Sequence, residues 1–229
     1  MSSERRHEIS RLEAFSDAVF AFALTLLVVA LEVPKNYGEL MRTMSGFLPF
    51  ACCFALLVWI WYEHNLFFRR FGLQDNYTVV LNGALLFVVL FYVYPLKFMF
   101  SSLFARIVPA LRDTAEPMRL RELANASAVY SSGFVVLFLM FVLLYRHVYA
   151  KRDALGLTEL EAFDARAAMG HHTISMGVGL LALALALASP NFAPLSPVTF
   201  TLMGPVHWWY GVRSGRERDG LEKRLAVPV

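Results

Sequence analysis

Long apolar runs dominate the chain, and short polar segments separate them. The first run extends from Ala14 to Val33, and its length is about what an α-helix needs to cross a bilayer core. Because a single span in lipid must satisfy its own backbone hydrogen bonds, each run is expected to be helical. The pattern therefore predicts one all-α integral membrane domain over residues 1–229. Its six helices are expected at about 14–33, 44–62, 77–104, 126–147, 168–188 and 198–212.

Composition supports this interpretation and narrows the function classes. Hydrophobic residues make up 58% of the chain and charged residues 17%, against ~45–50% and ~25% in soluble domains. Basic residues gather at the ends of the runs, which is typical of membrane orientation rather than nucleic-acid binding. The first run is too long for a cleavable signal peptide, so we expect it to remain as a span.

The distribution of Lys and Arg predicts the orientation. Of the 21 basic residues, 14 fall on the side shared by the N-terminus, the 63–77 link, the 146–167 link and the segment after residue 212. Only six fall on the other side. Since cytoplasmic loops carry the excess of positive charge, we expect a multi-pass protein of the cell membrane with both termini in the cytoplasm.

The first span has two distinct sides. On a helical wheel one stripe contains Phe15, Ala18, Phe22, Thr25, Leu26, Val29 and Val33. Asp17 points about 140° away from Phe22. Apolar stripes of this kind are most often packing faces between helices.

Asp17 has two open interpretations. An acid at a membrane edge normally has a partner or water, and the candidate partners are Arg11, His64, Arg69 and Arg70. Alternatively, Asp17 caps the helix and interacts with its dipole.

The same span resembles a known family. The pattern R-x-x-x-F-S-D, followed by V-F-A-x-x-x-T-L-L, is similar to the first helix of the lysosomal potassium channel family (transmembrane protein 175) and its prokaryotic relatives. The matching residues are Arg11, Phe15, Ser16, Asp17, Val19, Phe20, Ala21, Thr25, Leu26 and Leu27. The end of the second span, W-I-W-Y-E-H-N-L-F-F-R-R, also resembles the family, with Glu63 and Asn65 as departures from its more basic cluster. Trp59, Trp61 and Tyr62 there are typical of an interfacial aromatic belt.

The resemblance implies a potassium-selective or potassium-preferring cation channel. It would be a homo-oligomer, a tetramer of six-helix subunits, with the first helices lining a central pore. The hydrophobic constriction would comprise Phe22, Thr25, Leu26 and Val29, with the threonine tuning cation choice. The relatives usually carry isoleucine or leucine where this chain has Phe22. A signature group at the cytoplasmic end would hold the pore helix in place, and it comprises Arg11, Phe15, Ser16, Asp17 and His64.

The expected mechanism is that of an apolar neck. The chain has no TVGYG-like loop, so a dehydration barrier, rather than a cage of carbonyls, would select the ion. Glu32 at the outer mouth would concentrate cations there, or would be only a solvated helix end. We expect no bound cofactor or metal, and K⁺ and other monovalent cations as the permeant species.

Two other function classes can be compared with the sequence. A secondary transporter or proton-coupled carrier would use Asp17 as a titrating site, and Asn82 and the proline-bearing spans are hints of the polar midplane site it needs. An enzyme is not expected, because the sequence shows no cluster of catalytic groups. The adjacent His171 and His172 point in different directions on a helix and so do not form one metal face.

Overall fold

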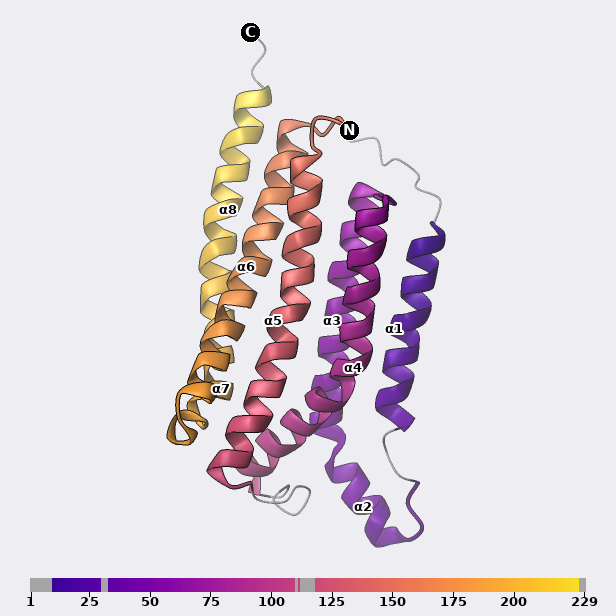
Figure 1. The fold of residues 1–229 in the computed structure, drawn as a ribbon, viewed down its shortest axis with the longest axis vertical. Helices are drawn as coiled ribbons and strands as arrows, with labels where there is room; N and C mark the ends of the chain where they lie inside the picture. The colour runs from indigo at the N-terminus through magenta and orange to yellow at the C-terminus, as the bar shows by residue number, and fades with distance from the viewer. Residues whose placement is uncertain (1–9, 30–32, 110, 112–117, 227–229) are drawn as a thin grey trace. The chain divides into compact units, whose positions relative to one another are not determined.

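A computed structural model describes residues 10–29, 33–109, 111 and 118–226, and most of these residues are helical (Figure 1). The chain separates into two compact units, residues 1–119 and 120–229, and each is considered by itself. Among the described residues, five helices are long and apolar enough to cross a membrane: Arg11–Val29, Phe47–Phe71, Asn76–Ile107, Leu120–Ala150 and Glu159–Ala188. The predicted all-α membrane class is confirmed, whereas the sixth span stays a prediction.

The first unit contains helices α1 (Arg11–Val29), α2 (Tyr37–Ser45), α3 (Phe47–Phe71) and α4 (Asn76–Ile107). Helices α1, α3 and α4 all pack against one another. The start of α1 is a capping box, in which Ser10 N–H donates to Glu13 Oε2 at 2.7 Å and Glu13 N–H donates to Ser10 Oγ at 3.1 Å. These bonds satisfy amides that the first turn would otherwise leave unpaired, so the helix begins before the predicted residue 14.

Helix α3 continues well past its predicted end at residue 62. It closes at Gly72, whose φ of 57° is in the left-handed region that glycine adopts without a steric penalty. Asp75 then caps α4 by accepting a hydrogen bond from Thr78 N–H at 2.8 Å. The extra turns of α3 carry His64 into the buried interior of the first unit.

The second unit is built on the antiparallel pair α5 (Leu120–Ala150) and α6 (Glu159–Ala188), which lie side by side (Figure 1). The buried positions of α5 recur every seven residues, as in Leu123, Tyr130, Leu137 and Leu144. This spacing is typical of coiled-coil-like packing. Gly179 of α6 permits close approach, since a Cβ placed there would lie 2.8 Å from Phe134 Cδ1.

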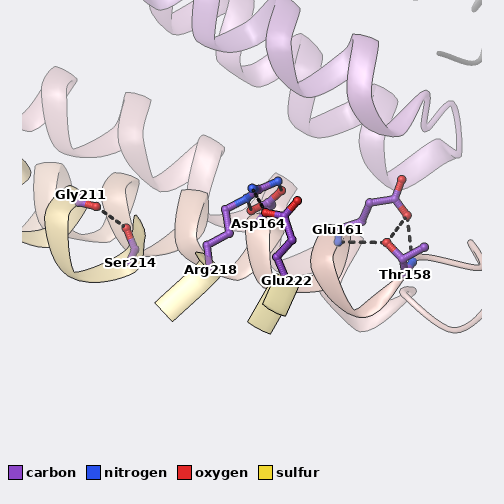
Figure 2. A network of polar contacts seen from close by, with 7 residues as sticks. All are labelled: Thr158, Glu161, Asp164, Gly211, Ser214, Arg218 and Glu222. Carbon is purple, nitrogen blue, oxygen red and sulfur yellow. Dashed lines mark hydrogen bonds and ion pairs between the residues drawn. The ribbon is translucent and has the colours of Figure 1, made fainter. Parts of the chain in front are cut away.

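After α6 the chain forms η2 (Pro190–Phe192), α7 (Leu195–Val198), η3 (Thr199–Leu202) and α8 (Met203–Ala226). Helix α8 continues through the charged segment that follows the predicted sixth span. Figure 2 shows a contact that ties this segment to α6: Arg218 Nε donates to Asp164 Oδ1 at 2.9 Å, close to the capping box of Thr158 and Glu161. The Asp164 carboxylate also raises the pKa of the Arg218 guanidinium.

Candidate functional site on helix α1

Helix α1 has two faces with opposite environments. Its buried face carries residues spaced three or four apart, namely Glu13, Ser16, Phe20, Ala23 and Leu27. The other face holds side chains that the chain leaves exposed, with Phe22 at 56% and Val29 at 70% exposure. The helix is therefore held on one side and presents an uncovered surface on the other.

A directed chain of hydrogen bonds joins the buried face of α1 to α3 and α4. Asn82 Oδ1 of α4 lies 2.7 Å from His64 Nε2 of α3, and Asn82 Nδ2 donates to Ser16 Oγ at 2.9 Å. Ser16 Oγ in turn donates to the backbone oxygen of Leu12 at 2.8 Å. Since an amide oxygen only accepts, His64 carries its proton on Nε2.

This chain of bonds is enclosed in apolar and aromatic groups. Ser16 and Asn82 are fully buried and His64 nearly so. The His64 ring lies 5.3 Å from the ring of Phe20 and 4.7 Å from that of Phe68, measured between centroids. A buried polar group is costly unless it is paired, so the three side chains stabilise the unit only as a complete set.

Asp17 is paired with a group that the sequence did not suggest. Trp61 Nε1 of α3 donates to Asp17 Oδ1 at 2.8 Å. The partner in this hydrogen bond, Trp61, was not among the basic candidates, and the capping alternative is wrong because α1 begins at Arg11. In the sequence, Trp61 indicated only a residue at the membrane interface. Its indole N–H is nevertheless a hydrogen-bond donor that needs a partner when it is partly buried.

The predicted signature group is only partly assembled. Ser16 and His64 meet through Asn82, and Asp17 meets Trp61. Arg11 is exposed, and Phe15 is 60% exposed on the side that carries Phe22. Neither side chain belongs to the buried chain of hydrogen bonds.

The four predicted constriction residues lie together on α1. Phe22, Thr25 and Val29 are exposed and Leu26 is half-buried. Thr25 Oγ1 donates to the backbone oxygen of Ala21 at 2.9 Å. The Thr25 hydroxyl proton is therefore engaged within the helix. The oxygen lone pairs of Thr25 remain available to contact a cation. Glu32, the predicted outer-mouth residue, lies outside the described residues.

Other chemistry finds little support in the described part of the chain. No group of three or more His, Cys, Asp or Glu residues there is placed to hold a metal ion. Asn82, a hint of a carrier site, uses its amide in the buried bonds to Ser16 and His64. A midplane polar pocket would need that amide to be available.

The known proteins to which this chain is similar are named potassium channels. A family model described as the endosomal/lysosomal potassium channel TMEM175 matches residues 11–92. A potassium channel of Marivirga tractuosa is 38% identical over 220 residues, covering 91% of this chain and 89% of that protein. A potassium channel of Chamaesiphon minutus is 27% identical over 197 residues, covering 82% and 89% respectively.

Solved structures are similar over most of the chain. The crystal structure of a variant of the potassium channel MtTMEM175, in complex with a nanobody–MBP fusion protein, matches with a TM-score of 0.80 and 33% identity. It covers 93% of this chain and 97% of that one. A lysosomal potassium-selective channel TMEM175 homolog from Chamaesiphon minutus matches with a TM-score of 0.58 and 26% identity, covering 89% and 96%.

Proposed function

Because this chain belongs to the TMEM175 family of potassium channels, which are not enzymes, we propose that it is itself a potassium-preferring cation channel. Its pore would form where α1 helices of several subunits meet around a common axis. No cofactor takes part in this function, and K⁺ is the permeant species. The relatives are named potassium channels, which supports potassium as the ion, and the two faces of α1 support the location of the ion path.

The contrast between the faces of α1 is the single observation that carries the proposal. Buried hydrogen bonds through Ser16 fix the rotation of α1 about its own axis. That rotation leaves Phe22, Thr25 and Val29 uncovered by the rest of the chain. An uncovered apolar face is suited to form a hydrophobic constriction, and Thr25 adds one oxygen-bearing side chain to it.

The neck would select by the energy of dehydration. An ion passing Phe22 and Val29 finds no groups that replace its water shell, so the barrier grows with the strength of hydration. Potassium holds its water less tightly than sodium and crosses more readily. Thr25 would add a ring of oxygen lone pairs one turn beyond Phe22. The phenyl rings would narrow the path further, or present their faces to the cation.

The assembly follows the family pattern in this proposal. We place four subunits around the pore, each with six spans, the sixth near residues 198–212. Both termini lie in the cytoplasm, according to the excess of basic residues on that side. The group around Ser16, Asp17 and His64 then lies at the cytoplasmic end of α1, and Glu32 at the outer end.

Ion flux into vesicles tests the function and the pore position together. Purified protein in vesicles with a potassium gradient should give passive flux that does not saturate. Phe22→Ala should increase the flux and weaken the preference for potassium over sodium, because it widens the neck. Phe87→Ala is the matched control, since Phe87 is a 70% exposed phenylalanine on α4, outside the stripe. Equal effects of the two changes would remove Phe22 from the pore, and saturable, proton-coupled flux would indicate a carrier.

The subunit number is tested separately. Native mass spectrometry of the protein in detergent should give a mass close to four times that of one 25.9 kDa chain. A single chain would contradict the proposal outright, because one α1 helix cannot enclose an ion path.

A further inference from the structure

Helix α2 turns its apolar side away from the protein. Tyr37, Leu40, Met41 and Met44 recur at the spacing of one helical face. All four are exposed, with Tyr37 at 76%. Large apolar side chains gathered on an outer face mark an interaction surface rather than a random exposure.

The polar side of α2 is the less exposed one. Glu39, Thr43 and Ser45 are half-buried. Glu39 is also engaged locally, since Lys35 N–H donates to its Oε2 at 2.7 Å and Asn36 Oδ1 accepts from its N–H at 2.9 Å. A helix on a water-soluble protein would show the opposite arrangement, with its apolar stripe inward. The outward stripe of α2 therefore faces an apolar surrounding.

The position of α2 indicates what that surrounding is. Only Gly46 separates α2 from α3, a helix long and apolar enough to cross a membrane. Phe47 and Leu48, in the first turn of α3, are exposed and follow Met44 after Ser45 and Gly46. The outer surface of α2 thus continues into the surface of a membrane-crossing helix.

We propose that α2 is an interfacial helix that lies at the boundary between lipid headgroups and acyl chains. Its stripe of Tyr37, Leu40, Met41 and Met44 enters the acyl region, and the side with Glu39 faces headgroups and the protein. This is the arrangement of amphipathic helices that lie on a membrane without crossing it. It anchors the link between α1 and α3 to the bilayer surface.

Lipid fits this surface better than a second copy of the chain. A stable interface between subunits buries roughly 800 Å² on each partner. The α2 stripe is a single row of four side chains on a nine-residue helix, too small for that area by itself. Contact with lipid does not require a minimum area. The α2 stripe also leads directly into α3, whose first turn exposes apolar side chains.

Spin labels on the two sides of α2 test the proposal directly. A nitroxide is attached to Met41→Cys, and to Gly38→Cys as the matched control on the polar side, in a chain with Cys52→Ala and Cys53→Ala. In vesicles, accessibility to oxygen reports lipid and accessibility to a water-soluble nickel chelate reports water. The ratio of oxygen to nickel accessibility should be several-fold higher at Met41 than at Gly38. Met44→Cys repeats the measurement if the Met41 variant does not fold.

Two results would overturn the assignment. Equal preference of both labels for the nickel chelate would place α2 in water. Low accessibility to both reagents at Met41, with dipolar broadening between labels, would instead place a second copy on the stripe. Potassium flux is measured in the same vesicles. If the labels place α2 in lipid but the protein does not conduct potassium, the location of α2 is supported while the proposed channel function fails.

Discussion

The three packed helices of the first unit and the α5–α6 pair of the second unit are held together by different means. In the first unit, Ser16, His64 and Asn82 form a directed series of buried hydrogen bonds between three helices. In the second unit, α5 and α6 meet through apolar residues of a seven-residue repeat and a close contact at Gly179. Two buried hydroxyls on α5, those of Ser127 and Ser131, have no hydrogen-bond partner among the described residues.

This difference parallels the extent of the family model. The matching family model covers residues 11–92, all of them in the first unit. Directed hydrogen bonds require particular side chains at particular positions. Apolar packing mainly requires volume and tolerates exchange of one hydrophobic residue for another. A sequence motif is therefore easier to recognise where hydrogen-bonding side chains fix how the helices pack.

The largest effect should come from Asn82→Leu. It removes both hydrogen bonds of the amide and leaves Ser16 and His64 buried without this partner. At about 1–3 kcal/mol for each unsatisfied group, the loss is roughly 2–6 kcal/mol of unfolding free energy. Denaturant unfolding of the protein in detergent measures it. Asn125→Leu, at an exposed position of α5, is the matched control, and an equal loss there would show that the buried bonds are not special.

A glycine pair tests the apolar packing of the second unit. Gly179→Ala should lower the unfolding free energy by about 1–3 kcal/mol, because its Cβ meets Phe134 and Val135. Gly177→Ala, where nothing lies within 4 Å of the new Cβ, should be neutral or gain up to about 1 kcal/mol from helix propensity. Melting temperatures of the two variants should separate. Identical shifts would mean that α5 and α6 do not meet closely at Gly179.

Two buried serines sharpen the comparison between the units. Ser16→Ala leaves the Asn82 amide without its acceptor and should cost about 1–3 kcal/mol. Ser131→Ala removes a hydroxyl that has no partner among the described residues, so it should be neutral or slightly stabilising. Both side chains are fully buried, and thermal unfolding in detergent compares them under one condition. Equal losses at the two serines would contradict the contrast.

The smallest effect is expected at the pair of Trp61 and Asp17. Trp61→Phe keeps the ring but removes the N–H donor, and both partners are half-buried. We expect a loss of about 1 kcal/mol in stability. The ratio of potassium to sodium flux should stay the same, because Asp17 faces away from the stripe that carries Phe22. A changed flux ratio with unchanged stability would move Asp17 from a structural to a permeation role.

Several features were predictable because they depend on residues close together in the chain. The apolar runs and their length identify helices in a membrane, and the spacing of residues in the first run separates the side of Phe22 from the side of Asp17. Boundaries were less predictable. Helices α1 and α8 extend beyond the apolar runs, to the capping box at Ser10 and Glu13 and past the contact between Arg218 and Asp164.

The partners within the site depend on contacts between distant parts of the chain. Ser16 and Asn82 are 66 residues apart, and Asp17 and Trp61 are 44 apart. Nothing in local spacing selects Asn82 as the side chain that bridges Ser16 and His64, since a helical pattern shows which residues face inward but not which of them meet.

By itself, the sequence determined the membrane class, the family and the two-sided character of the first helix, because hydrophobicity and helical periodicity are local properties. Only the tertiary structure decided that Asn82 and Trp61 hold that helix and that α2 turns its apolar side outward. Hydrogen bonds act over about 3 Å, so their partners are settled only when packing brings the helices together.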